Sequence, residues 1–268
     1  MQADGPALGL SGPVSGDAPL LSARDVHRHF EGMRAVDGVS IDVLPARLTG
    51  LIGPNGAGKS TLLAVLAGTL PASSGSITFD GRDIARLPAY RRARLGVVRT
   101  FQLSSEFGQL TVLENLLATA PGNRGDSLVG ALLGRRHWGA DERRLVAEAR
   151  DLLDRFRMRA MEDEYAGNLS GGQKRLVEIM RALMLRPRLL LLDEPMAGVH
   201  PAVVHEIART LEALRDDGLT ILMVEHQLGM VERLCDPVIV MAQGQVIGEG
   251  SLASLRRQRE VVDAYLVG

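Results

Sequence analysis

The segment from residue 53 to residue 61 restricts the possible folds of this chain more than any other feature. It reads Gly53-Pro54-Asn55-Gly56-Ala57-Gly58-Lys59-Ser60-Thr61 and fits the G-x-x-x-x-G-K-[ST] pattern of a phosphate-binding loop. In such a loop, glycines let the backbone amides wrap an anion, and the loop opens onto a helix N-terminus whose dipole favours negative charge. Lys59 adds a charge for nucleotide phosphates, and the Ser60 hydroxyl can bind Mg²⁺. The alternative, a chance glycine-rich turn, is disfavoured because an apolar run precedes the segment and a helical pattern follows it.

The sequence on either side alternates between strand and helix patterns. Apolar runs or alternating apolar residues predict strands at 39–43, 48–53, 76–79, 189–192 and 219–224, and a hairpin at 238–247 around Gly244. Helical spacing predicts helices at 59–67, ended by Gly68, and at 202–214. Short apolar strands separated by helices indicate a parallel sheet covered on both faces. We therefore predict an α/β fold: a P-loop NTPase core with a mixed sheet, an antiparallel β portion and an inserted helical subdomain.

The middle of the chain has a different pattern. Residues 111–184 are almost entirely helical in spacing, and Thr111 with Glu114 has the spacing of a capping box. A second helix is predicted to begin at Asp141, and the glycine-containing segment 121–140 is predicted to be an insertion. Residues 1–19, rich in Gly, Pro, Ala and Ser, are predicted to be a flexible tail. The expected organisation is thus a tail at 1–19 and a folded domain at 20–268, with the helical subdomain within it at about 103–185.

Two carboxylates follow the apolar run 189–192. Asp193 and Glu194 come at the expected carboxyl end of a parallel strand, where ligands bind in α/β sheets. A carboxylate at the end of a buried strand is costly unless it meets a cation. Asp193 is therefore predicted to organise Mg²⁺, and Glu194 to act as the base that polarises an attacking water. The alternative is an Asp-Glu pair that only caps a helix.

A second anion-binding pattern begins at Leu169. Ser170, Gly171, Gly172 and Gln173 open a helical run that continues to Leu185, so a helix N-terminus again presents amides to an anion. The chain thus carries two phosphate-binding loops. Together with Asp193 and Glu194, these loops make the chain resemble the ATP-binding-cassette (ABC) ATPases. The resemblance extends over about residues 20–268 and implies that the loop at Ser170 closes on a nucleotide held by a second ATP-binding subunit.

Three further roles are implied by the resemblance. Gln102 matches the glutamine that contacts the metal or the water, His226 matches the switch histidine at the γ-phosphate, and Phe30 matches the aromatic residue that stacks on adenine. The expected ligands are ATP and Mg²⁺. The remaining histidines, namely His27, His29, His137, His200 and His205, are expected not to form a metal site, because their spacing shows no supporting acids or cysteines.

A closer resemblance is to the ATPases of branched-chain amino-acid importers. It is carried by residues 30–32, 87–96, 111–116 and 264–266, and by the insertion at 121–140. Related urea and amide importers share much of the pattern. The implied partners are transmembrane permease subunits, an identical or paralogous ATP-binding subunit and a solute-binding protein. One departure is that His200 stands where the family usually has Asn or Asp, which leaves the coupling between subunits at that loop open.

Composition and charge exclude some classes of partner and cellular compartment. Charged residues nearly cancel, to a net charge of −1, which argues against a nucleic-acid partner. The single cysteine, Cys235, favours a reducing compartment, and neither a signal peptide nor a membrane span is expected. We therefore predict a peripheral location on the cytoplasmic face of the membrane.

The main alternative is a soluble ABC ATPase without a permease. A small-molecule kinase would leave Ser170 and His226 without a purpose, and a non-hydrolysing binding module would not need Glu194.

Overall fold

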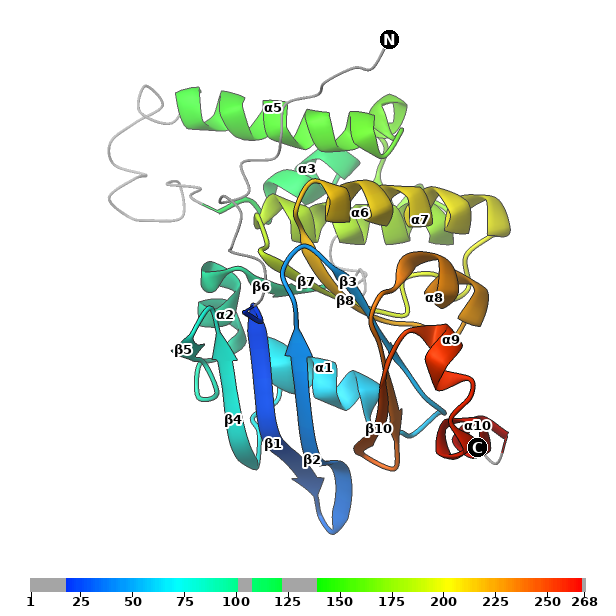
Figure 1. Ribbon diagram of the computed structural model, residues 1–268. Coiled ribbons are helices and arrows are strands. Elements are labelled where there is room, and N and C mark those ends of the chain that lie inside the picture. The colour runs from blue at the N-terminus through cyan, green and yellow to red at the C-terminus, as the bar shows by residue number, and fades with distance from the viewer. Residues whose placement is uncertain (1–17, 101–107, 122–138, 267–268) are drawn as a thin grey trace. The chain divides into compact units, whose positions relative to one another are not determined.

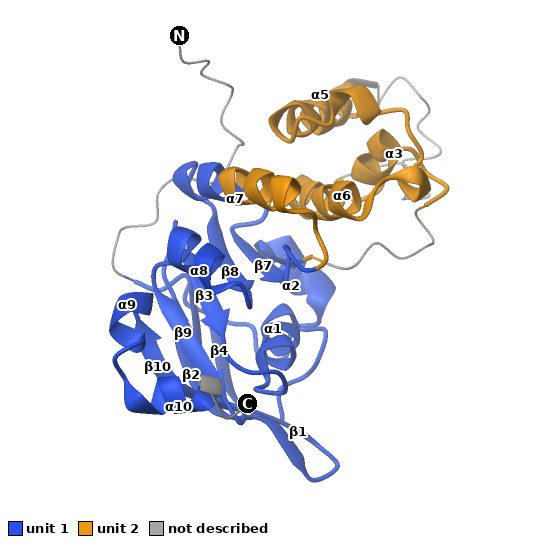
Figure 2. Ribbon diagram, turned by 90° about the vertical axis from the view of Figure 1, so that its right-hand side faces the viewer, with its two compact units in different colours: residues 1–99, 187–197, 211–268 blue, residues 100–186, 198–210 orange. Residues whose placement is uncertain are grey.

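The computed structural model describes residues 18–100, 108–121 and 139–266, and these residues form two compact units. Unit 1 consists of residues 1–99, 187–197 and 211–268, and unit 2 of residues 100–186 and 198–210 (Figure 2). The predicted tail, Gln102 and most of the predicted insertion at 121–140 lie outside the described residues.

A six-stranded sheet organises unit 1 (Figure 1). Its order is β10 (Gln245–Gly250), β9 (Val238–Ala242), β3 (Leu48–Ile52), β8 (Thr220–Val224), β7 (Leu189–Asp193) and β6 (Val97–Arg99). The pairings from β9 to β6 are parallel, and β10 pairs antiparallel with β9. Every residue of β3 and β8 is buried, as expected for strands covered on both faces. The predicted mixed sheet and its terminal hairpin are confirmed.

A second, antiparallel sheet completes the β structure of unit 1. Its order is β2 (Met33–Val43), β1 (Leu21–Phe30), β4 (Ser74–Phe79) and β5 (Arg82–Asp83). The predicted alternation at 39–43 is confirmed, because Val39, Ile41 and Val43 are buried. Asp80 and Gly81 both have positive φ, so they form the predicted tight turn between β4 and β5.

The helix after the phosphate loop lies in the core of unit 1. Helix α1 (Lys59–Ala67) has the predicted bounds, and Gly68 ends it in the left-handed conformation. Its leucines and valine join residues of both sheets in one apolar cluster. The remaining helices of the unit are α2 (Ala89–Leu95), α8 (Leu228–Leu234), α9 (Leu252–Leu255) and α10 (Arg259–Leu266). Burial on all sides fixes α1, and therefore the loop that opens onto it.

A buried arginine holds the end of α1. Arg92 of α2 is 1% exposed, and its guanidinium donates to the carbonyls of Val65 and Leu66 at 2.7 Å and of Ala85 and Leu87 at 2.9 Å. The first two are carbonyls near the C-terminus of α1, where positive charge is favourable. Burial lowers the pKa of Arg92 to about 10, which leaves it charged at neutral pH.

Unit 2 contains helices α3 (Val112–Leu117), α5 (Gly139–Arg155) and α6 (Gly171–Met184), and short 3-10 helices at Arg159–Met161 and Ala166–Asn168. Helix α7 (Pro201–Asp216) is divided between the units. The predicted capping box is confirmed, because the Thr111 hydroxyl accepts from the Glu114 amide at 3.1 Å and the Glu114 carboxylate accepts from the Thr111 amide at 2.8 Å. The helix predicted to begin at Asp141 begins two residues earlier, at Gly139.

Within the described ranges, no helix has both the length and the apolar character needed to cross a membrane. The thiol of Cys235 is buried beside Gly50, and burial raises its pKa to about 12, so it is neutral and unreactive at physiological pH.

Candidate functional site

The phosphate loop leaves the end of β3 and reaches α1 through a tightly packed turn. Gly53, Gly56 and Gly58 all have positive φ. A Cβ at Gly58 would lie 2.1 Å from the Ala35 carbonyl oxygen, and one at Gly53 would lie 2.0 Å from that of Met241. No atom lies within 4 Å of the corresponding position at Gly56. Two of the three glycines are therefore fixed by backbone packing, whereas Gly56 faces open space.

Lys59 lies at the base of this loop. Its ammonium donates to the carbonyls of Gly53 and Pro54, both at 2.8 Å, and the residue is 6% exposed. Burial lowers the Lys59 pKa, and the carboxylates of Glu194 and Asp193 oppose that shift. The loop thus carries a positive charge close to two carboxylates, which is the electrostatic arrangement expected of a site for an anion and a cation together.

The neighbouring strand ends bring the predicted carboxylates to this loop. Asp193 ends β7, which pairs with β8, and β8 pairs with β3. The Ser60 hydroxyl donates to Asp193 Oδ1 at 3.1 Å, and Arg99 at the end of β6 donates to Asp193 Oδ2 at 2.8 Å. The sequence interpretation missed Arg99, although a basic residue at the end of the short apolar run 97–98 was a usable signal.

The donor set at this point suits magnesium. Ser60 and Asp193 offer a hydroxyl and a carboxylate oxygen 3.1 Å apart, and Mg²⁺ prefers oxygen ligands, usually one or two from the protein together with waters and phosphate oxygens. The residues present therefore fit a nucleotide-bound Mg²⁺, and Ser60 and Asp193 are the residues that would hold it.

Glu194 and His226 meet at the same edge. His226 Nε2 lies 2.7 Å from Glu194 Oε1, and both side chains are about two-fifths exposed, so solvent reaches them. Glu194 has a φ of +49°, a conformation that L-residues other than glycine seldom adopt. Its amide donates to the Val224 carbonyl at 3.0 Å, which ties the Glu194 backbone to the end of β8. The structure therefore brings the predicted base and the predicted switch histidine into direct contact.

Glu225 is a second residue that the sequence interpretation missed. It is 3% exposed, and its carboxylate accepts backbone N–H bonds from Met196 at 3.1 Å, from His226 at 2.9 Å and from Gln227 at 3.3 Å. This one side chain connects the loop after β7, which carries Glu194, to the loop after β8, which carries His226. The sequence feature that could have identified Glu225 is its position directly before His226, where a carboxylate ends an otherwise apolar run.

Phe30 lies at the end of β1 and is half-buried. The guanidinium carbon of Arg28 is 4.4 Å from the centre of its ring, so a cation covers one face of the ring. Any stacking of a further ring on Phe30 is therefore confined to the opposite face.

The second predicted anion loop begins α6 in unit 2. The Ser170 hydroxyl accepts from the Gln173 amide at 3.3 Å, and the Gln173 side chain accepts from the Ser170 amide at 2.9 Å, which makes a capping box. A Cβ at Gly172 would lie 3.1 Å from Val203, whereas a Cβ at Gly171 would meet no atom within 4 Å. Packing inside the chain accounts for Gly172 but not for Gly171.

The departure at residue 200 has a local explanation. His200 Nδ1 accepts from the Ala202 amide at 3.3 Å, immediately before α7 begins at Pro201. The imidazole thus caps the helix in the manner of the shorter Asn or Asp side chain.

One grouping of side chains was not anticipated from the spacing of the histidines. His27, His29 and Asp37 each offer a ligand atom, and these three atoms lie within 4.8 Å of one another. The prediction considered spacing along the sequence, whereas Asp37 is brought to the histidines by pairing between β1 and β2.

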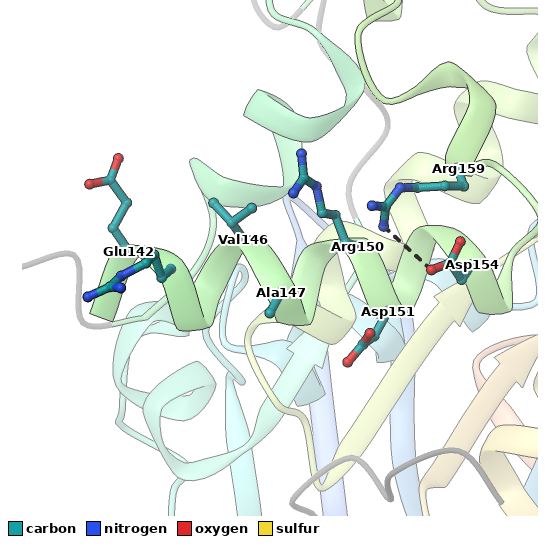
Figure 3. Close-up of a pocket in the computed structure, with 8 residues that line it drawn as sticks. Glu142, Val146, Ala147, Arg150, Asp151, Asp154 and Arg159 are labelled. Carbon is teal, nitrogen blue, oxygen red and sulfur yellow. Dashed lines mark hydrogen bonds and ion pairs between the residues drawn. The ribbon is translucent and has the colours of Figure 1, made fainter. Parts of the chain in front are cut away.

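A cavity of about 600 Å³ lies along α5 in unit 2 (Figure 3). Two of its arginines are paired with carboxylates: Arg150 with Glu162 at 3.1 Å, and Arg159 with Asp154 at 3.4 Å. None of the predicted nucleotide-site residues lines it, so it adds nothing to the phosphate site.

Comparison with known proteins agrees with this geometry. The model of the family described as "ABC transporter" matches residues 36–197, which include the phosphate loop, the Ser170 loop and Asp193. This chain belongs to the ABC transporter family.

Three relatives of this ABC ATPase are named for two kinds of transport. The Archaeoglobus fulgidus protein named "Probable branched-chain amino acid transport ATP-binding protein LivG" is 38% identical, over 92% of this chain and 95% of its own length. The Pseudomonas aeruginosa high-affinity branched-chain amino acid transport ATP-binding protein BraF is 34% identical, with 92% and 98% covered. The Escherichia coli lipopolysaccharide export system ATP-binding protein LptB is 35% identical, with 92% and 96% covered.

Solved structures confirm the fold of the ABC ATPase. A nucleotide-free ATP-binding cassette from an ABC transporter superposes with a TM-score of 0.81 at 37% identity, covering 92% of this chain and 98% of the other. An ADP conformation of an ATP-binding cassette superposes with a TM-score of 0.80 at 34% identity, covering 94% and 100%. The chain is thus an ATP-hydrolysing, nucleotide-binding subunit of the ABC class.

The packing of the loop glycines predicts that Gly56 and Gly58, two residues apart, tolerate substitution differently. Gly58→Ala should abolish nucleotide binding, because its Cβ would overlap the Ala35 carbonyl oxygen and its φ of +97° strains an L-residue. In the matched variant Gly56→Ala, the only expected penalty is the free energy of placing an L-residue in the left-handed conformation, about 1–2 kcal/mol. Fluorescent ATP-analogue binding and thermal melting of the two proteins check this. Equal affinity in both variants would contradict the packing account.

Proposed function

We propose that this chain hydrolyses ATP to power an ABC importer of branched-chain amino acids or related small solutes, at the cytoplasmic face of the membrane. The observation that carries the ATPase chemistry is the contact between Glu194 and His226 beside the Ser60–Asp193 pair. The ATPase domain is taken as residues 20–268, with a helical subdomain at about 103–185. The amide-lined loop from Gly53 to Thr61 surrounds the phosphates, and Lys59 supplies their nearest positive charge.

In the proposed mechanism, Glu194 orients a water molecule and takes up its proton as the water attacks the γ-phosphate. His226 holds the Glu194 carboxylate at 2.7 Å, and in this proposal it also contacts the transferred phosphate. Mg²⁺ held by Ser60 and Asp193 would neutralise phosphate charge. Phe30 stacks on adenine with its uncovered face, and Gln102, the family's glutamine-loop position, contacts the metal or the water.

A second ATP-binding subunit completes the site in this proposal. Ser170, Gly171, Gly172 and Gln173 present a helix N-terminus to an anion, and within the described part of the chain no neighbour of Gly171 requires a glycine there. In this proposal, a γ-phosphate held by the partner subunit approaches Gly171 closely, and this explains why the position is a glycine. The partner is either an identical chain or a paralogue.

The solute class rests on resemblance and on relatives. The motifs at 30–32, 87–96 and 111–116 resemble importers of branched-chain amino acids, and two of the relatives described above are named for that transport. The lipopolysaccharide-export relative has a similar identity, so it supports a second candidate function, export of a lipid-linked polysaccharide. In both cases the chain works with transmembrane permease subunits; an importer adds a solute-binding protein.

Replacing Glu194 tests the ATPase mechanism. Glu194→Gln should bind ATP normally but hydrolyse it about 10²–10⁴ times more slowly, because the amide cannot accept the proton. With ATP and Mg²⁺ the variant should form a stable pair, which sedimentation detects. Glu260→Gln, an exposed substitution on α10, is the matched control. Turnover at the parent rate in Glu194→Gln would refute the assignment of the base.

The buried carboxylate of Glu225 predicts a separate kinetic signature. Glu225→Gln places an amide NH₂ against backbone N–H groups, so the loops that carry Glu194 and His226 should shift. A displacement of about 1 Å can cost about 100-fold in rate, so kcat should fall while the KM for ATP stays near the parent value. Glu232→Gln, at an exposed ion pair with Arg256, is the control. A raised KM with unchanged kcat would show that Glu225 does not position the catalytic pair.

Uptake and partner capture test the transport assignment. A strain that lacks this chain should lose uptake of labelled leucine, isoleucine and valine, and the parent chain but not Glu194→Gln should restore it. Affinity purification from detergent-solubilised membranes should recover a permease with either protein, since the variant still assembles. Normal uptake together with defective lipopolysaccharide export would favour the second candidate, and recovery of the chain without any membrane protein would refute both.

A further inference from the structure

We propose that His27, His29 and Asp37 on the β1–β2 hairpin form a binding site for a divalent transition metal of the zinc class. The site lies in unit 1 and uses no residue of the proposed nucleotide site. Its three ligand atoms lie within 4.8 Å of one another. Two imidazoles and a carboxylate suit zinc and its neighbours, whereas magnesium and calcium prefer oxygen ligands.

Irregular pairing of the two strands brings the three side chains together. Val26 pairs with Val39 and Arg28 with Val36, so Asp37 and Gly38 together lie opposite the single residue His27. This is a β-bulge, and Gly38 adopts the positive φ of +73° that it requires. Bulges redirect side chains, and here Asp37 Oδ1 lies 3.1 Å from His27 Nδ1. His29 follows two residues later on β1, with its ring edge-on to that of His27 at 5.6 Å between centres.

His27 Nδ1 has two close polar neighbours on β2. The Gly38 amide nitrogen lies 3.1 Å from it, and Asp37 Oδ1 also lies 3.1 Å from it. The other ring nitrogen, Nε2, lies 3.1 Å from Asp25 Oδ1. A cation bound to Nδ1 and Asp37 Oδ1 would replace the contact with the Gly38 amide, and the ring proton would then be on Nε2, which would donate it to Asp25.

The surroundings complete the requirements of a metal site. Asp25 accepts from the second ring nitrogen of His27, which is the arrangement that orients metal-binding imidazoles elsewhere. Arg34 contacts the other oxygen of Asp37, Oδ2, at 3.4 Å and leaves Oδ1 directed at His27. A cavity of about 490 Å³ adjoins His27 and Asp37 and has room for water as a further ligand. His29 is exposed, so a rotamer change can close the remaining distance.

Cobalt and zinc titrations of the full chain test the site. The chain is treated with a chelator and then kept in excess Mg²⁺ without nucleotide, so that the Ser60–Asp193 site does not take up the probe. Co²⁺ should bind one ion per chain with the intense visible absorption of tetrahedral coordination, and Zn²⁺ should displace it. His29→Ala should remove that absorption, and Asp25→Asn should weaken Zn²⁺ binding about 10- to 100-fold.

Matched controls separate this site from other histidines and from misfolding. His205→Ala, an exposed histidine on α7, should bind Co²⁺ as the parent does. Zn²⁺ should raise the melting temperature of the parent and of His205→Ala but not that of His29→Ala, whose exposed side chain is not needed for folding. Parent-like Co²⁺ absorption in His29→Ala, or no stoichiometric binding by the parent, would overturn the proposal.

Discussion

Parallel pairing of β3, β8 and β7 is the constraint on which the nucleotide site depends. Parallel strands end at the same edge of a sheet, so the phosphate loop after β3, the carboxylates at the end of β7 and His226 after β8 are all delivered to one place. The contacts between Ser60 and Asp193 and between Glu194 and His226 follow from this register. A shift of one residue in either pairing would direct these side chains to opposite faces of the sheet.

Glu225 shows how the same edge is held rigid. A buried carboxylate is costly unless hydrogen bonds compensate for its lost hydration, and Glu225 receives three from backbone amides of two loops. The Glu194 amide bond to the Val224 carbonyl joins the ends of the two strands, and the bonds of Glu225 extend this connection to Met196, His226 and Gln227. The cost of burying Glu225 is therefore offset by the bonds that join the two loops, and removing this carboxylate would leave three donors unpaired.

The sequence predicts the parts of the fold that depend on local pattern. Helix α1 has its predicted bounds because Lys59 and Gly68 mark its two ends, and the predicted capping box at Thr111 uses side chains three residues apart. Arg92, Arg99 and Glu225 were missed because their partners are distant in sequence or are backbone atoms that no pattern displays. The cluster of His27 with Asp37 was missed for the same reason, since it depends on a bulge whose only sequence signal is Gly38.

The two proposed cation sites select ions by different chemistry. Ser60 and Asp193 offer only oxygen atoms, and their affinity for a metal depends on phosphate oxygens that arrive with the nucleotide. The hairpin site offers imidazole nitrogens from its own side chains, so it needs no nucleotide and competes poorly for Mg²⁺. Abundant cellular Mg²⁺ therefore does not fill the hairpin site, and a zinc-class ion bound there does not depend on the catalytic cycle. Because His29 directly precedes Phe30, such an ion would fix β1 to β2 beside the residue assigned to adenine.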